Sequence, residues 1–339
     1  MGKGGEASDV ANGLFRTSRL VAHPIVTIPL ISFFGIWLFF HEPGSSIVNV
    51  SISASMEWTK ALFAFIAIFG SLRLAKKENI LGWKFVSAAC IFWTIGQVVY
   101  GASIISYRRP ELPFSIADTF FLIAIPLALV GVFMVGMHGL RQMEKIRIAL
   151  DALAVSCAII FVSLTFIVEI VNKNQNSIPS NSEMQFIFFL LDVTFASMAL
   201  SMMLYRRLDK MIVPIGIGMV LQATADIMWV TDQFRGSFAT RPFARLLLLV
   251  AAALYCFSAT RTRGRPTKQG NLESEKQLRL GVFATVFSVI IFALLKLPTV
   301  ENISPIVAIS FVALFFVTLI GQVVSHFENS RLSRDQSKS

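Results

Sequence analysis

Charged residues are scarce in this sequence. They make up 15% of its 339 residues, whereas 55% are hydrophobic, and the mean hydropathy is positive. An ordinary soluble domain carries more charge and fewer apolar residues. The composition therefore excludes that class and predicts a protein of the lipid bilayer.

Cysteine is also scarce. The three cysteines lie singly inside apolar segments, without C-x-x-C spacing, at Cys90, Cys157 and Cys256. This pattern argues against a disulfide framework and against a zinc site. It predicts buried thiols without a chemical role.

Enzyme motifs are missing as well. The sequence has no P-loop, G-x-S-x-G, H-E-x-x-H or G-x-G-x-x-G in a usable context. His23, His138 and His326 have no partners at metal-ligand spacing, which argues against a metal or haem site. We therefore predict that the chain is not an enzyme, has no catalytic residue, and binds no metal or cofactor.

Long hydrophobic runs are what the sequence has in abundance. A run of about 20 apolar residues can cross the hydrocarbon core of a bilayer as a helix. The runs predict an all-α, polytopic membrane bundle of ten transmembrane helices, at residues 20–40, 58–74, 81–106, 116–138, 148–171, 184–205, 211–231, 243–260, 278–297 and 303–324.

Basic residues between the runs predict the orientation of the bundle. The net charge of +10 would fit a nucleic-acid partner, but the Lys and Arg residues lie mostly in short connections between runs. Positive charge there decides which end of a helix stays in the cytoplasm. Most of it falls on the side of both termini, and the connection 41–57 has none. We predict cytoplasmic termini, residues 41–57 outside, and no nucleic-acid partner.

The runs and the polar stretches between them predict five parts of the chain. The longest cytoplasmic connection carries the basic stretch RTRGRPTK and separates eight spans from a terminal pair. The predicted parts are a cytoplasmic tail at 1–19, an eight-span membrane core at 20–260, a cytoplasmic loop at 261–277, a two-span hairpin at 278–325 and a cytoplasmic tail at 326–339.

An internal repeat is indicated when the chain is compared with itself at an offset of 129 residues. Gln97 then aligns with Asp226, and Tyr100 aligns with Trp229. The second to fourth spans would recur as the sixth to eighth, in the same orientation, as a parallel repeat. Chance similarity among apolar helices is the alternative.

The fourth span opens with a capping pattern. Ser115 and Asp118 have the S-x-x-D spacing of an N-terminal cap, which predicts that the carboxylate satisfies free amides at the start of the helix. Pro126 removes one backbone hydrogen bond and frees the carbonyl of Leu122. In lipid that carbonyl needs a donor from a neighbour, so we expect this helix to be packed against others.

Carboxylates inside spans are costly, so each one needs a physical reason. For Asp118 the cap is the reason. Asp151 follows Arg147 by four residues in the first turn of its span, where an ion pair and the helix dipole both favour it. We therefore interpret both residues as structural.

Asp192 and Asp226 have no such local reason. Counted from the predicted outer ends of their helices, both lie about 9–12 Å deep. Gln97 lies in the same belt, and Arg245 could reach down towards it. The four residues predict either a polar pocket that binds a ligand, an ion or a proton, or a buried network that ties helices together.

Several stretches together resemble a known family. They are LGWKFVSAACIFWTIGQVVYG, PFSIADTFFLIAIPLALVGV, RIALDALAVSCAIIF, FLLDVTFASMALSMMLYRR and GMVLQATADIMWV. They are similar to the polytopic N-terminal membrane region of bacterial diguanylate cyclases, GGDEF-EAL phosphodiesterases and histidine kinases, over residues 58–325. The resemblance implies a sensory module of a bacterial inner membrane. Asp118, Pro126, Asp151, Asp192 and Asp226 match its recurring positions, whereas Gln97 replaces an Asp and Ile125 a Tyr.

Members of that family usually continue into GGDEF, EAL or kinase domains, and these motifs do not occur in the 339 residues. We therefore expect a non-catalytic sensor-type module that signals to, or docks with, a partner protein or a second copy of itself. Two other functions remain open: an accessory subunit of a larger membrane complex, and a small-molecule transporter.

Overall fold

The computed structural model describes most of the predicted core. The described residues are 24–40, 47–108, 115–140, 148–158, 190–199, 212–235 and 241–261, with a few single positions between them. Within these ranges the chain forms α-helices and no strand. The prediction of an all-α fold is confirmed for this part of the chain.

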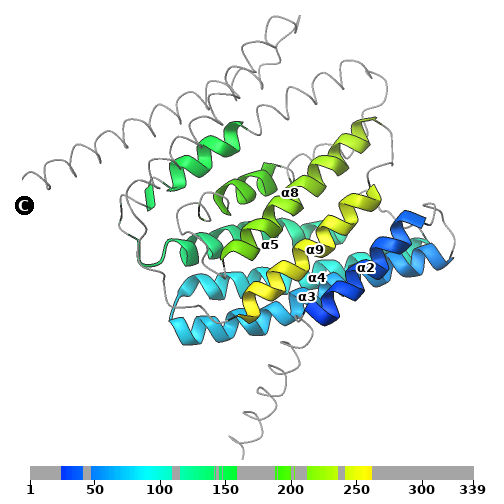
Figure 1. The fold of residues 1–339 in the computed structure, drawn as a ribbon, viewed down its shortest axis with the longest axis horizontal. Coiled ribbons are helices and arrows are strands. Elements are labelled where there is room, and N and C mark those ends of the chain that lie inside the picture. The colour runs from blue at the N-terminus through cyan, green and yellow to red at the C-terminus, as the bar shows by residue number, and fades with distance from the viewer. Residues whose placement is uncertain are drawn as a thin grey trace, which may run out of the picture.

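Six labelled helices make up most of the fold. Their bounds are α2 Pro24–Phe40, α3 Ile47–Glu78, α4 Leu81–Tyr107, α5 Ile116–Gly136, α8 Ile212–Arg235 and α9 Arg241–Thr260 (Figure 1). Two shorter helical stretches, Ile148–Ala158 and Leu190–Ala199, lie between α5 and α8 in the chain.

The helices are those of a membrane protein. Within the described residues, α3, α4, α5 and Pro242–Thr260 of α9 are long and apolar enough to cross a bilayer. Shorter apolar helices are described at Val26–Leu38, Ile148–Ala158, Leu190–Ala199 and Val213–Trp229. The predicted spans at 278–297 and 303–324 lie outside the described residues, so the total of ten stays a prediction. The repeat also stays a prediction, because its sixth span is described mainly over 190–199.

The start of α3 corrects the predicted outer connection. Residues 47–57 were expected in a loop, but they form the first three turns of a 32-residue helix. Two hydroxyl side chains near this start bond to carbonyls one turn earlier in the helix. Ser55 Oγ donates to the carbonyl of Ser51 at 2.7 Å, and Thr59 Oγ1 donates to that of Ser55 at 2.8 Å.

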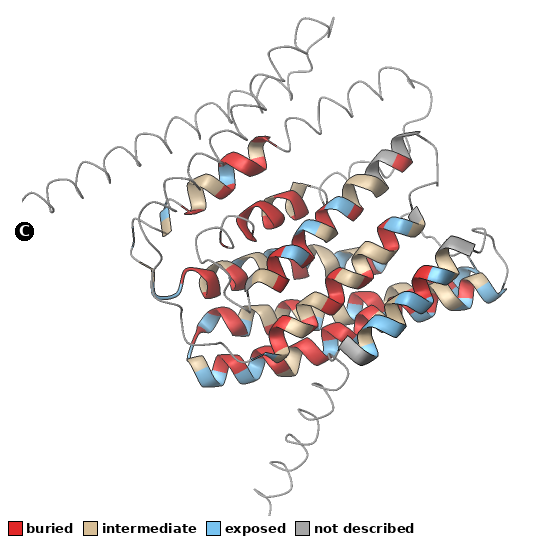
Figure 2. Ribbon diagram, in the orientation of Figure 1, coloured by how far each residue is buried: buried red, intermediate tan, exposed pale blue. Residues whose placement is uncertain are grey.

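The helices pack in two groups that meet at α9. Helices α3, α4 and α5 lie side by side in chain order, and α8 packs against α9 (Figure 1). Helix α9 also packs on α3, and α2 packs on α9. Of the most apolar window of α3, 56% is buried inside the protein, against 28% for α4. Helix α3 is therefore central, and exposed residues lie on the outer faces of the bundle (Figure 2).

Two apolar clusters hold these groups together. One joins α3, α2 and α9 through Phe34, Phe63 and Leu249. The other joins α4 and α5 to α8 and the stretch 190–199, and its members include Trp83, Val135, Phe195 and Met219. The contact of α4 with α5 is close because Gly82 and Gly131 face each other. A Cβ atom at Gly82 would lie 2.7 Å from the carbonyl oxygen of Gly131.

Helix α5 has the start that its sequence suggests. The backbone amide of Ser115 donates to Asp118 Oδ2 at 2.6 Å, and the amide of Ala117 donates to Ser115 Oγ at 3.2 Å. These bonds form a capping box. Pro126 lies inside α5, whose helical conformation continues through it to Gly136.

Candidate functional site

Asp192 and Asp226 lie together inside the bundle. Asp192 comes from the stretch 190–199 and its residue is 3% exposed, whereas Asp226 comes from α8 and is partly buried. Their two carboxyl groups are in hydrogen-bond contact. Because a carboxylate can only accept hydrogen bonds, such a contact requires that one of the two groups carries a proton. The sequence placed both at one depth, and the structure brings them into contact.

That depth is greater than the sequence predicted for Asp226. Asp232 was taken as the outer end of the helix, but α8 continues to Arg235 and Asp232 is buried. Asp226 therefore lies nine residues before the end of α8, or about 14 Å at 1.5 Å per residue. A carboxyl group at that depth needs protein partners rather than water.

Gln222 and Tyr255 complete the surroundings of Asp192. Gln222 Nε2 donates to Asp192 Oδ1 at 2.7 Å, and the hydroxyl of Tyr255 donates to Gln222 Oε1 at 3.0 Å. Gln222 lies one turn before Asp226, so the two side chains share a face of α8. Tyr255 extends the network to α9.

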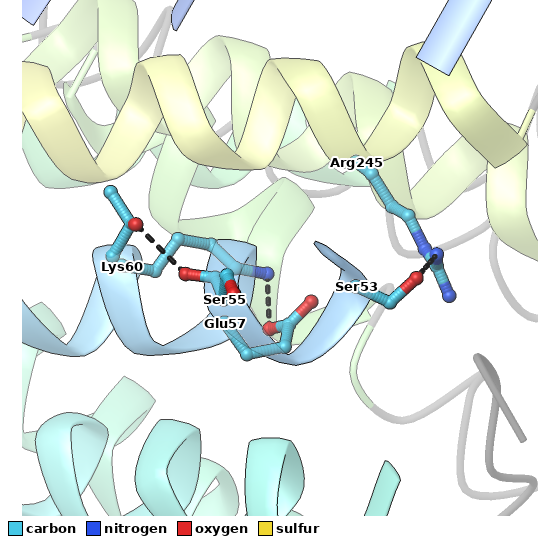
Figure 3. A network of polar contacts seen from close by, with 6 residues as sticks. Ser53, Ser55, Glu57, Lys60 and Arg245 are labelled. Carbon is cyan, nitrogen blue, oxygen red and sulfur yellow. Dashed lines mark hydrogen bonds and ion pairs between the residues drawn. The ribbon is translucent and has the colours of Figure 1, made fainter. Parts of the chain in front are cut away.

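A buried ion pair on α3 approaches the aspartates from the other side. Lys60 Nζ lies 2.5 Å from Glu57 Oε2, and both side chains are 5% exposed (Figure 3). The positive charge of Lys60 also acts on Asp226. Lys60 is thus a cation that bears on acids of two helices.

Gln97 joins the site through Glu57. Its Nε2 donates to Glu57 Oε2 at 2.6 Å and its Oε1 accepts from Trp93 Nε1 at 3.2 Å, an amide orientation assigned from these partners. The sequence placed Gln97 beside Asp192 and Asp226. The structure places Glu57 and Lys60 between them.

Arg245 holds three helices together near this site. Its Nη1 donates to Ser53 Oγ of α3 at 3.2 Å (Figure 3), and its guanidinium lies 6.0 Å from the centroid of the Trp229 ring of α8. Ser53 lies one turn before Glu57 on α3. These contacts of Arg245 lie beside the ion pair.

We call this series of interacting residues the polar chain. It runs through residues of α4, α3, α8, the stretch 190–199 and α9, in the order Trp93, Gln97, Glu57, Lys60, Asp226, Asp192, Gln222 and Tyr255. Lys60 and Asp226 are linked by electrostatic attraction alone. Every other link is a hydrogen bond or an ion pair.

Sequence reasoning missed five members of the polar chain. Glu57 was placed at the end of a loop and Lys60 was passed over, although their i,i+3 spacing inside a helix would mark an ion pair. Trp93, Gln222 and Tyr255 have no signal of their own, because single polar or aromatic residues in a span are common at membrane interfaces. For Gln222, the position one turn before Asp226 was the available signal.

The remaining candidates lie elsewhere. Ser115, Asp118 and Pro126 belong to α5, where the first two form its cap. Asp151 lies in the helical stretch 148–158 and is partly buried. None of these four residues is a member of the polar chain.

The chemistry of the polar chain is that of proton donors and acceptors. Among the described residues, no three His, Cys, Asp or Glu side chains gather as a metal site would require. Cys256 is buried, whereas Cys90 and Cys157 are only partly so, which corrects the expectation for these two thiols. What the site offers is a carboxyl pair, a buried ion pair, two amides, an indole and a phenol. Comparison with family models, with curated proteins and with solved structures finds no match to this chain.

Proposed function

We propose that this chain is a non-catalytic, sensor-type module of a bacterial inner membrane that passes a signal to a partner protein or to a second copy of itself. The observation that carries the proposal is the polar chain, which connects the α3–α4 group to α8, α9 and the stretch 190–199 through the interior of the bundle. The resemblance of its sequence to membrane sensory regions supports it.

The arrangement suits a switch because each half of the polar chain is complete by itself. In one half Gln97 donates to Glu57 and accepts from Trp93, and in the other Gln222 donates to Asp192. Lys60 is the cation between the halves. A change of charge at either half alters the attraction between α3 and α8, and packed helices respond to such changes by discrete shifts.

The predicted repeat supports the same idea. The offset of 129 residues that aligns Gln97 with Asp226 also aligns Trp93 with Gln222. In each proposed copy, these two positions lie one turn apart on one helix. In the first copy Gln97 donates to Glu57 of another helix, and in the second both Gln222 and Asp226 interact with Asp192 of another helix. Two matched halves joined by one cation would form a symmetric bistable element.

Cytoplasmic termini belong to the proposal, because a partner with an output domain would lie in the cytoplasm. The test is Ser45→Cys, at a position in the predicted outer connection. A membrane-impermeant thiol reagent added to spheroplasts should label this cysteine, in a background where the three native cysteines are replaced by Ala. Labelling only after the membrane is permeabilised would reverse the orientation.

The function is tested by isolating the full-length protein from its native membranes in mild detergent. We expect a stoichiometric partner with a nucleotide cyclase, phosphodiesterase or kinase domain, or a dimer of the chain. The activity of that partner should change when Asp226→Asn is introduced and should be unaffected by Asp118→Asn, the matched control.

A transporter is the second candidate, and the buried Asp192–Asp226 pair is the observation that favours it. Carboxyl pairs of this kind bind the coupling ion in transporters. Isolated monomers that accumulate a solute in proteoliposomes, and lose that ability on Asp226→Asn, would overturn the sensor proposal in favour of the transporter.

A further inference from the structure

A hydrogen bond between Asp192 and Asp226 needs a hydrogen that the neighbouring side chains do not supply. Gln222 uses Nε2 to donate to Asp192, and its Oε1 is held by the hydroxyl of Tyr255. The orientation of this amide is therefore determined, and it presents a donor to Asp192. The hydrogen between the two carboxyl groups must then belong to one of them, as a titratable carboxylic acid.

The charged and titratable groups that face the pair come from three other helices. Helix α3 presents Lys60 and Glu57, which neutralise each other as an ion pair. Helix α9 presents Tyr255, and α4 presents Cys90 within electrostatic reach of Tyr255. With one shared proton, the Asp192–Asp226 pair leaves one negative charge in this interior. A second proton would leave the interior neutral.

Two protonation states of this interior are therefore open to the protein. The first is the hydrogen-bonded pair with one proton, whose charge is offset by the nearby ammonium of Lys60. The second is the fully protonated pair, which removes the cost of a buried charge. Two separate carboxyl groups in water do not have these alternatives, because both are ionised at neutral pH.

We propose that the Asp192–Asp226 pair is an exchangeable proton site at the centre of the polar chain. Uptake forms one O–H bond on a carboxylate oxygen and adds one positive charge, and release reverses this, without oxidation or group transfer. The inference rests on the proposed sensor function in one respect, which is that it names the proton as the ligand that the module responds to.

Lys60 is the group through which α3 senses the state of the site. With the pair charged, the ammonium of Lys60 is attracted both by Glu57 of its own helix and by Asp226 of α8. With the pair neutral, only Glu57 attracts it. Proton uptake thus weakens one electrostatic link between α3 and α8 and leaves the Glu57–Lys60 pair in place.

Infrared difference spectroscopy of the full-length protein in lipid nanodiscs tests the proposal. Spectra are recorded between neutral and alkaline buffer, where carboxyl groups in water are fully ionised. We expect a carbonyl band of a protonated carboxylic acid that is present at neutral pH and loses intensity at alkaline pH, as the pair passes from two protons to one. Heavy-isotope labelling of aspartate should shift the band, which separates it from Glu57 without any substitution.

Variants then assign the band. Asp192→Asn and Asp226→Asn should each abolish it, whereas Asp118→Asn, in the cap of α5, should leave it intact. A band that survives in both site variants, a band that ignores the aspartate label, or a spectrum without a band at neutral pH would overturn the proposal. Should a variant not fold, the labelled wild-type protein still decides.

The nanodisc sample contains no partner protein, so this test is independent of the sensor function. A pH-dependent aspartate band with no partner in native membranes would support the proton site and count against the sensor. A stoichiometric signalling partner in native membranes, with no such band in nanodiscs, would support the sensor and count against the proton site.

Discussion

Two contact regions of this bundle are built on opposite principles. The contact of α4 with α5 is apolar and close, because Gly82 and Gly131 allow the two backbones to approach each other. Where α3 packs on α9 and α9 packs on α8, the interior holds the polar chain, with a buried Glu57–Lys60 pair and the Asp192–Asp226 pair. Close glycine packing has one good arrangement. A chain of donors, acceptors and charges can have several, and function is therefore expected there.

The largest effect should come from removing the cation of the polar chain. Lys60→Met leaves Glu57 as an uncompensated charge inside the bundle and should destabilise the fold by about 3–5 kcal/mol. The measurement is the folded fraction against denaturing detergent. Lys76→Met, an exposed position on the same helix, is the matched control and should have almost no effect.

A double variant sharpens this prediction. Glu57→Gln combined with Lys60→Met removes both charges, so it should recover most of the stability lost in Lys60→Met alone. An additive loss in the double variant would mean that the two side chains do not depend on each other in the folded protein.

The next largest effect should come from the glycine contact. Gly82→Ala places a methyl group 2.7 Å from the carbonyl oxygen of Gly131, so α4 and α5 must move apart, at a cost of about 2–3 kcal/mol. Gly35→Ala is the control, because its Cβ would lie 3.6 Å from Leu246, and there the better helix propensity of Ala should leave the melting temperature unchanged or higher. Equal effects at the two glycines would contradict the close contact of α4 with α5.

Two substitutions of Asp226 distinguish the structural role of the polar chain from its proposed signalling role. Asp226→Leu removes the carboxyl partner of Asp192, leaving it only the bond from Gln222, and should cost about 2 kcal/mol. Asp226→Asn keeps a hydrogen-bonding side chain and should retain the wild-type melting temperature within a few degrees, while it abolishes the signal. If Asn and Leu destabilised the protein equally, hydrogen bonding would not be what holds this position.

Tyr255 should show the smallest effect. Tyr255→Phe removes the hydroxyl that donates to Gln222 Oε1 at 3.0 Å, and one such bond contributes about 1 kcal/mol. The melting temperature should fall slightly, and the rotation of the Gln222 amide should become possible. If Tyr255→Phe lowered the melting temperature more than Asp226→Leu does, the bond from α9 would contribute more to stability than the side chain of Asp226.

The sequence was most informative where local signals decide the structure. The apolar run 81–106 predicted α4 to within one residue of its end at Tyr107. The left-handed conformation of Arg108 terminates the helix there. The S-x-x-D pattern predicted the start of α5. It was least informative at α3, because the apolar run begins at residue 58, whereas the helix begins at Ile47 and Ser55 bonds to a carbonyl within it.

For the candidate site, the rise of a helix per residue was a partial guide. It placed Asp192 and Asp226 at a common depth, and the two are in contact. It assigned Gln97 to the same pair, whereas Gln97 binds Glu57. The period and rise of a helix indicate which residues share a face and how deep they lie. They do not indicate which helices are neighbours.

By itself, the sequence determined that the described chain is helical and belongs in a membrane, because long apolar runs with few charges leave backbone groups no other way to be satisfied in lipid. The tertiary structure alone decided which polar groups meet. The Glu57–Lys60 pair, Asp192 and Asp226 are far from one another in the chain, and the packing of α3 against α9 and of α9 against α8, with the contact of the stretch 190–199 with α8, brings them into one network. Their partners follow from that packing because a buried polar group is stable only where a complementary group is near.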